Sequence, residues 1–278
     1  MTQYIIKTTG KKQKFSAAKL MRSLWRAGAP VAVAQEIVAT LPLERLHTTQ
    51  DIHRYAFRML RTNYAPTAAR YNMKAALLRL GPSGFPFEQF VAEIFRALGY
   101  RVQTNQVLPG KCVTHEVDVV AENDERKVFM ECKYHNQKHL RSPVQVALYV
   151  KARFDDVRET MARDAGGKKI QGLVVTNTEF SHDARAYARC VAGLGLIEWR
   201  RPRGFSLAQL VDRTGLHPVS ALTSLSRRQK DELMRKGVVL CRDVATHQDM
   251  LASIGVSAKK RERVVREAQA ICALKPTL

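Results

Sequence analysis

The strongest constraint on the fold is one stretch near the middle of the chain, residues 128–134, with the sequence VFMECKY. Its side chains alternate with the two-residue period of a strand, so Glu131 and Lys133 project from one face while Met130 and Cys132 point to the other. The stretch therefore predicts a strand of a sheet. A carboxylate and an ammonium group side by side on one face of such a strand require a chemical explanation.

Similar patterns around this stretch predict a mixed sheet flanked by helices. Alternating or apolar runs between turns predict further strands at residues 100–107, 115–121, 170–176 and 195–199. An apolar stripe at helical spacing predicts a helix from Pro86 to Gly99, and further helices are expected at about 143–158 and after Ser181. The order α, β, β, β, α, β, α, β indicates an α/β fold of modest size.

Acidic side chains on neighbouring elements are expected to meet beside Glu131. Alternation along residues 115–121 places Asp118 on one face with Glu116 and Val120, and Val117 and Val119 on the other. If this strand and the next form a hairpin through residues 123–125, Asp118 and Glu131 reach the same edge of the sheet. Two carboxylates there could bind a hard cation such as Mg²⁺ or Mn²⁺, and Lys133 could offset charge that develops on a phosphate.

This constellation resembles the PD-(D/E)xK nuclease superfamily: Asp118, twelve intervening residues, then Glu131-Cys132-Lys133, all preceded by a helix that carries Glu88. The segment from Phe87 to Val102 is most similar to Mrr-type restriction endonucleases and also resembles archaeal Holliday-junction resolvases. The resemblance implies a Mg²⁺- or Mn²⁺-dependent DNA endonuclease with a restriction-endonuclease-like fold. It further implies that Asp118, Glu131 and Glu88 are metal ligands and that Lys133 is the catalytic lysine.

Three further features bear on this resemblance. Gln145-x-x-x-Tyr149 is similar to a helix motif of RecB-type nucleases, which implies that Gln145 belongs to the catalytic site. Val117 stands where many members have proline, and the usual glycine-rich approach to the acid is reduced to Gly110. Plain helix packing is the alternative reading of Gln145 and Tyr149, and surface salt bridging is the alternative for the charged residues.

The net charge of +21 is distributed unevenly along the chain. Residues 1–80 carry 14 Lys and Arg against 3 acidic residues, residues 81–200 carry 17 against 15, and residues 201–278 carry 15 against 7. Basic flanks attract polyanions, whereas a middle rich in both signs suits a site that holds several carboxylates. Because linker sequences at 81–84 and 200–204 coincide with these changes, we expect three domains, 1–80, 81–200 and 201–278.

The first 80 residues are expected to form a basic hairpin on a small helical bundle. Strands at residues 4–7 and 13–15 flank a turn at Gly10, and helices follow that are capped by Ser16 and by Thr48 or Thr49. The arrangement resembles the ATP-cone domain of ribonucleotide reductases and of the repressor that controls their genes. The matching stretches are Lys7-x-x-Gly10, Phe15-Ser16-x-x-Lys19, Thr49-x-x-x-His53 and the region of residues 69–74.

The ATP-cone resemblance implies a regulatory site for ATP or dATP. The implied binding residues are Lys7, Gly10, Phe15, Ser16, Lys19, Thr49 and His53. Fixed ammonium groups and a glycine turn can accept a triphosphate, and an aromatic ring can cover a purine. Thr8, Thr9 and Gln13 differ from the residues usual in that family, which leaves the choice between ATP and dATP open. A basic hairpin that binds nucleic acid is the alternative.

The last segment is expected to be a basic helical domain. Apolar residues between Leu207 and Ala268 predict four or five short helices, with Ser206 and Ser257 as candidate caps. Ile254-Gly255-Val256, followed by a basic run, resembles the hairpin of helix-hairpin-helix DNA-binding modules, in which a glycine turn approaches phosphates. A solvated charged helix face is the other reading.

The remaining features indicate a soluble intracellular protein. No apolar run approaches the roughly 20 residues of a membrane span, the start of the chain does not resemble a signal peptide, and five scattered cysteines suit a reducing compartment, so we expect a cytoplasmic protein. ATP-cone domains often control association, so a homo-oligomer is expected by resemblance. The alternatives to a DNA endonuclease are a non-enzymatic, nucleotide-responsive DNA-binding regulator and a nuclease for branched DNA or RNA.

Overall fold

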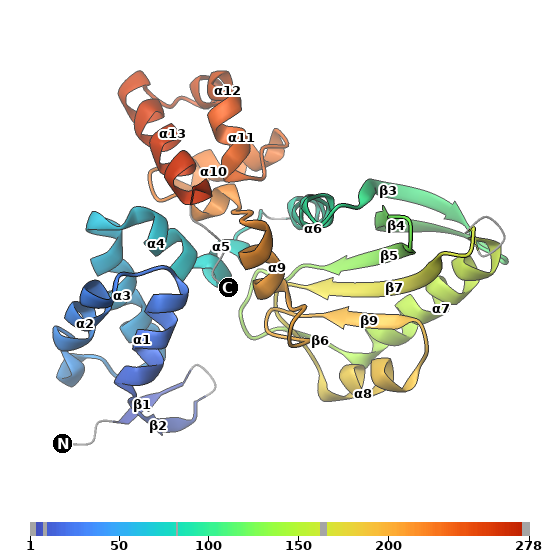
Figure 1. Ribbon diagram of the computed structural model, residues 1–278, viewed down its shortest axis with the longest axis horizontal. Coiled ribbons are helices and arrows are strands. Elements are labelled where there is room, and N and C mark those ends of the chain that lie inside the picture. Colours follow the sequence, from blue (N-terminus) through green and yellow to red (C-terminus); the bar gives the residue numbers. More distant parts are fainter. Residues whose placement is uncertain (1–3, 8–9, 82, 162–165, 274–278) are drawn as a thin grey trace.

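The structure is a computed structural model that describes residues 4–7, 10–81, 83–161 and 166–273. Figure 1 shows three groups of elements: a helical N-terminal unit in blue, a central sheet with its helices in green and yellow, and a helical C-terminal region in orange and red. The mixed α/β architecture predicted for the middle of the chain is confirmed. None of the helices in the described part of the chain has the length and apolar character needed to cross a membrane.

The N-terminal unit consists of a hairpin and a helical bundle. Its elements are β1 (Tyr4–Ile6), β2 (Lys12–Lys14), α1 (Ala17–Arg26), α2 (Val31–Ala39), the 3-10 turn Leu43–Arg45, α3 (Thr49–Asn63), α4 (Ala65–Tyr71) and α5 (Met73–Leu77). Ser16 caps α1 as expected, because its hydroxyl accepts a hydrogen bond from the Lys19 amide at 3.3 Å. Thr48 rather than Thr49 caps α3, since Thr48 and Asp51 exchange side-chain and backbone hydrogen bonds.

The central sheet has the strand order β3-β4-β5-β7-β9. These strands are β3 (Arg101–Pro109), β4 (Thr114–Glu122), β5 (Arg126–Lys133), β7 (Lys169–Thr176) and β9 (Leu194–Ile197). The pairs β3–β4 and β4–β5 are antiparallel, and the pairs β5–β7 and β7–β9 are parallel. Two short strands, β6 (Arg141–Ser142) and β8 (Glu179–Phe180), form a separate parallel pair.

Helices cover both faces of this sheet, which agrees with the apolar patterns of its strands. α6 (Phe85–Ala97) packs against one face, where its phenylalanines join Val119 and Met130 in the main core. α7 (Val144–Met161) and α8 (His182–Cys190) pack against the other face, around Val174 and Phe129. Pro86 lies in the first turn of α6, and the cap of α8 by Ser181 is confirmed.

β4 changes the face to which its side chains point near Asp118. The expectation that Val117 and Val119 share a face is wrong, because Val117 packs with Phe129 on the α7 side and Val119 belongs to the α6 side. Regular pairing of β4 with β5 ends at Val119, whereas the rest of β4, as far as Thr114, is paired with β3 alone. On β3, Asn105 lies between the partners of Val119 and Val117 and has a left-handed φ of 52°, which marks the same distortion.

The C-terminal region contains five helices among the described residues. They are α9 (Leu207–Thr214), α10 (Arg227–Arg235), α11 (Cys241–Thr246), α12 (Gln248–Ser253) and α13 (Ala258–Cys272), with a 3-10 turn at Val219–Ala221. Ser206 caps α9 through a capping box with Gln209, whereas Ser257 precedes α13 without a side-chain cap bond. Gly255 makes the turn between α12 and α13 with φ 73°. The main core is continuous from Ala69 through α6 to Ile271, so α5 packs with the two later regions.

Candidate active site

Asp118 and Glu131 lie where β4 and β5 separate. Beyond the pair Val119–Met130 the ladder stops, and the Asp118 carboxylate accepts a hydrogen bond from the Cys132 amide at 2.7 Å in place of a backbone carbonyl. Two strands that diverge leave room between their ends for side chains and ligands. The fork therefore places an acid from each strand at one edge of the sheet.

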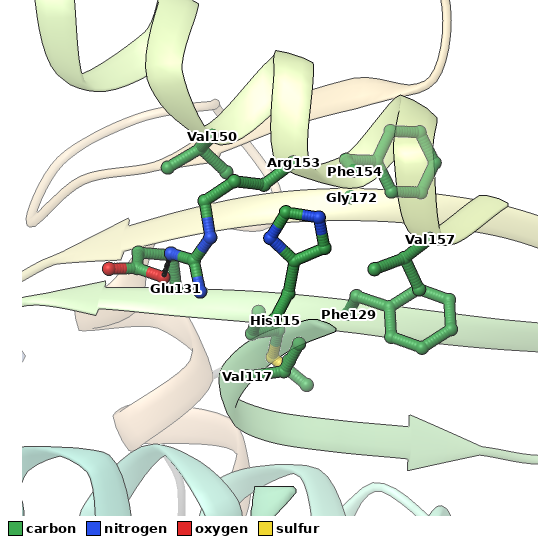
Figure 2. A pocket seen from close by; sticks show the side chains of 10 residues that line it. His115, Val117, Phe129, Glu131, Val150, Arg153, Phe154, Val157 and Gly172 are labelled. Carbon is green, nitrogen blue, oxygen red and sulfur yellow. Dashed lines mark hydrogen bonds and ion pairs between the residues drawn. The ribbon is translucent and has the colours of Figure 1, made fainter. Parts of the chain in front are cut away.

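Glu131 is held between two cations. Its Oε1 lies 2.6 Å from Nζ of Lys133, which confirms that the two side chains share a face of β5. Its Oε2 lies 2.7 Å from a guanidinium nitrogen of Arg153 on α7, and Figure 2 shows Arg153 reaching down from that helix to Glu131. The other end of the Arg153 guanidinium donates to the carbonyl of Glu116 on β4. Arg153 thus connects α7 to both strands of the fork.

Glu88 joins the group from the first turn of α6. Burial, followed by the charges of Asp118, Glu131 and Glu116, raises the pKa of Glu88 to about 7. Burial and the charge of Glu131 likewise raise the pKa of Asp118 to about 6, against the opposing effect of the Cys132 amide. The negative charges of these half-buried carboxyl groups repel one another. A cation bound among them would reduce this repulsion.

The donor set fits a hard divalent cation that keeps part of its water shell. Mg²⁺ is usually held by one or two carboxylates together with water and substrate phosphate, and Asp118 and Glu131 supply oxygen ligands of this kind. Among the residues that the structure describes, no three His, Cys, Asp or Glu side chains form a group that could hold a metal ion, so the predicted set of three ligands, Glu88, Asp118 and Glu131, is not assembled as such a group.

A hollow of about 380 Å³ opens beside Lys133. Its walls are Gly84, Cys132, Lys133, Tyr134, His135, Asn136 and Leu140. On the α7 side of Glu131 there is a second, smaller cavity of about 30 Å³ between His115, Arg153 and apolar side chains, which is drawn in Figure 2. Lys133 lies on the wall of the larger hollow, whereas Glu131 lines the smaller cavity.

Gln145 and Tyr149 lie on the exposed face of α7. Gln145 is exposed in the first turn, and Tyr149 is 60% exposed with the Arg153 guanidinium carbon 5.2 Å from its ring centre. Sequence reasoning missed Arg153, although it continues the spacing of four residues from Gln145 through Tyr149. That spacing keeps one face of a helix, so it was the signal by which Arg153 could have been found.

The turn between β3 and β4 is tied to α7. The Asp156 carboxylate accepts hydrogen bonds from the amides of Cys112 at 2.9 Å and Val113 at 3.3 Å, and lies 2.8 Å from Nε2 of His115. These bonds, led by that with His115, lower the pKa of Asp156 to about 2. Gly110 packs so closely against Asp156 that a side chain would not fit without a shift of the turn.

Four of the residues predicted to bind a nucleotide lie after the end of β1 or in the first turns of α3. The Ile6 amide donates to the carbonyl of His47 at 2.8 Å, and this joins the strand before Lys7 to the helix that begins at Thr49. Gly10 forms the turn with φ 80°. One helical turn after Thr49, the ring of His53 stacks on Tyr71 at 4.6 Å.

The other three predicted residues lie at the entry to α1. Phe15 packs against the core of the N-terminal unit, the Ser16 hydroxyl is engaged as the helix cap, and Lys19 is exposed. Gln13 is on β2, whereas Thr8 and Thr9 lie outside the described residues. The structure thus shows a hairpin beside two helix starts, and the nucleotide site remains a prediction.

Comparisons with known proteins agree with the geometry of the sheet. Residues 81–201 match the family model of a restriction endonuclease catalytic domain, Mrr_cat, and residues 217–272 match the AF1548-like C-terminal model. An uncharacterized protein of Archaeoglobus fulgidus is 36% identical over 182 residues, which cover 65% of this chain and 99% of that protein. The crystal structure of the protein of unknown function AF1548 is similar with a TM-score of 0.55 and 35% identity, over 68% of this chain and 98% of that one.

Proposed function

Because the chain belongs to the family of the AF1548-like proteins and carries a restriction-endonuclease-type domain at residues 81–201, we propose that it is a metal-dependent endonuclease that hydrolyses phosphodiester bonds in DNA. The observation that supports this most directly is the cluster at the β4–β5 fork, where Glu88, Asp118, Glu131 and Lys133 lie within reach of one another's charges. An ammonium group, a proton-accepting carboxylate and two ligand carboxylates are the groups that such hydrolysis requires.

In this proposal Asp118 and Glu131 hold Mg²⁺ or Mn²⁺, which supplies Lewis acidity at the phosphate when bound. Lys133 on the wall of the hollow donates hydrogen bonds to the scissile phosphate and offsets the negative charge that develops there. Glu88, with a pKa of about 7, takes up the proton of the attacking water at its carboxylate, or completes the ligand shell. Gln145 and Tyr149 on the exposed face of α7 contact the nucleic acid next to this group.

The decisive experiment compares wild type with Lys133→Gln on linear, nicked, branched and single-stranded DNA and on RNA, with and without Mg²⁺ or Mn²⁺. Lys127→Gln is the matched control, because Lys127 lies on the same strand at its far end and pairs there with Glu122 at 3.7 Å. We expect Mg²⁺-dependent cleavage by wild type and the Lys127 variant, and loss of cleavage in the Lys133 variant. Equal activity of all three proteins would exclude the proposed site.

We also propose that the N-terminal unit binds ATP or dATP and thereby regulates cleavage or the assembly of a homo-oligomer. The support is the ATP-cone-like order of hairpin and helices, with Lys7 and Thr49 on segments that the Ile6–His47 bond joins. Isothermal titration of wild type and Lys7→Ala with both nucleotides, together with measurement of the mass in solution, tests this. Lys14→Ala on β2 is the control. Absence of nucleotide binding, or binding that changes neither the rate of cleavage nor the mass in solution, would refute the regulatory proposal.

A further inference from the structure

The end of α5 is bonded to both later regions of the chain. Three successive carbonyls there each accept a hydrogen bond from a side chain of another region: Ala76 from the Ser220 hydroxyl at 2.8 Å, Leu77 from the Asn177 amide at 3.3 Å, and Leu78 from the Tyr134 hydroxyl at 2.9 Å. Carbonyls at the end of a helix lack their usual partners within that helix, so they can accept such bonds, and that of Ala76 accepts a second one from the Arg79 amide at 2.9 Å. The last helix of the N-terminal unit is therefore attached to the sheet at two points and to the C-terminal region at one.

Both attachments to the sheet are made close to Lys133. Tyr134 follows Lys133 in the chain, and Asn177 follows Thr176, the partner of Lys133 in the β5–β7 ladder. Asn177 is fully buried, and its amide group accepts from the His135 backbone N–H at 2.9 Å and donates to the His135 carbonyl at 2.7 Å. Its neighbour Thr176, also fully buried, donates its hydroxyl to the Lys133 carbonyl at 2.7 Å. These side chains extend the β5–β7 ladder beyond its last backbone pair, Lys133 and Thr176.

Tyr134 holds the same segment from α5 and α6. Its hydroxyl reaches Leu78, and its ring packs against that of Phe87 with centres 5.9 Å apart. The backbone from the Lys133 carbonyl to His135 is therefore fixed by hydrogen bonds with Thr176 and Asn177 and by the bond of Tyr134 to Leu78. A buried polar network of this kind favours one backbone conformation, because in any other the buried donors and acceptors would be left without hydrogen-bond partners, which costs free energy.

We infer that Tyr134 and Asn177 are positioning residues, which anchor the strand end that carries Lys133 to the Leu77 and Leu78 carbonyls of the N-terminal unit. The inference rests on the proposed nuclease function and adds to it that the N-terminal unit is part of the support of the active site. Displacement of α5 breaks the hydrogen bonds that Tyr134 and Asn177 donate to it. The Lys133 ammonium group is then no longer held in its position beside Glu131.

The test compares Tyr134→Phe with Ser220→Ala. Each variant loses one hydroxyl that donates to a carbonyl at the end of α5, at 2.9 and 2.8 Å, but only Tyr134 adjoins Lys133. We expect kcat of Tyr134→Phe to fall about 10-fold and that of Asn177→Ala about 100-fold, with KM for DNA unchanged, because small misplacements of a catalytic group cost factors of this size. Ser220→Ala should cleave like wild type. Equal kcat in Tyr134→Phe and Ser220→Ala overturns the inference.

Hydrogen exchange at the His135 amide provides a readout that does not depend on cleavage. We expect this amide to exchange faster in Tyr134→Phe and Asn177→Ala than in wild type and in Ser220→Ala, since Asn177 accepts its hydrogen bond. If wild type cleaves no substrate, the proposed function fails and the exchange rates alone decide the inference. Exchange at His135 that is the same in Tyr134→Phe as in Ser220→Ala then overturns it.

Discussion

Replacement of Arg153 by methionine tests the electrostatics of the fork. Arg153 and Glu131 lie 2.7 Å apart with side chains only 17% and 12% exposed, and Arg153 also bonds to the Glu116 carbonyl. Methionine retains most of the apolar stem that packs on α7 but removes the charge and the donors. Glu131 then retains Lys133, at 2.6 Å, as its cationic partner within this cluster.

The expected loss of stability follows from the burial of the pair. Removal of one partner of a buried ion pair costs about 3–5 kcal/mol. Because Lys133 stays close to Glu131 and neither side chain is fully buried, we expect about 2–3 kcal/mol for Arg153→Met. Arg158→Met on the same helix is the control, since the Arg158–Asp155 pair is 4.0 Å apart and largely exposed and should contribute under about 1 kcal/mol.

Urea unfolding in EDTA and in excess Mg²⁺ measures both effects. A cation at 100 times its Kd stabilises the folded state by about 2.7 kcal/mol. Mg²⁺ should stabilise Arg153→Met more than wild type, because it replaces the positive charge beside Glu131 that the substitution removes. A loss no larger than that of Arg158→Met, or a response to Mg²⁺ no greater than that of wild type, would refute this account of the fork.

Two further predictions concern other parts of the molecule. Burial lowers the pKa of His217 from 6.5 to about 4, so as the pH falls the unfolded chain takes up the proton before the folded protein does. The free energy of unfolding of wild type, measured relative to that of His217→Gln, should therefore be highest above pH 6.5 and fall by about 3 kcal/mol as the pH drops to 4. A difference in urea unfolding that does not change with pH would contradict this. Gly110→Ala should lower the free energy of unfolding by about 1–3 kcal/mol, because its Cβ would overlap Asp156 and lie 2.5 Å from the Val113 carbonyl. An unchanged melting temperature would show that the turn adapts to the added methyl group without cost.

Local patterns predicted the elements of the sheet closely. Strands and helices were placed within a few residues of their bounds because alternation and helical spacing are properties of neighbouring residues. The sidedness of Val117 failed for the same reason, since strict alternation assumes that β4 stays paired as far as Asp118, whereas its pairing with β5 ends at Val119. Whether a strand stays paired with its neighbour depends on the elements that pack on it, and the sequence of the strand alone does not specify these.

The sequence by itself determined which acids and which lysine could meet at one edge of a sheet, because the strand spacing that brings Asp118 toward Glu131 is local. Only the tertiary structure decided what holds them. Arg153 reaches Glu131 across 22 positions, and Asn177 reaches Leu77 across 100, because α7 folds over the sheet and α5 abuts its edge. Contacts between distant positions arise from the packing of whole elements on a shared core, and no spacing along the chain records them.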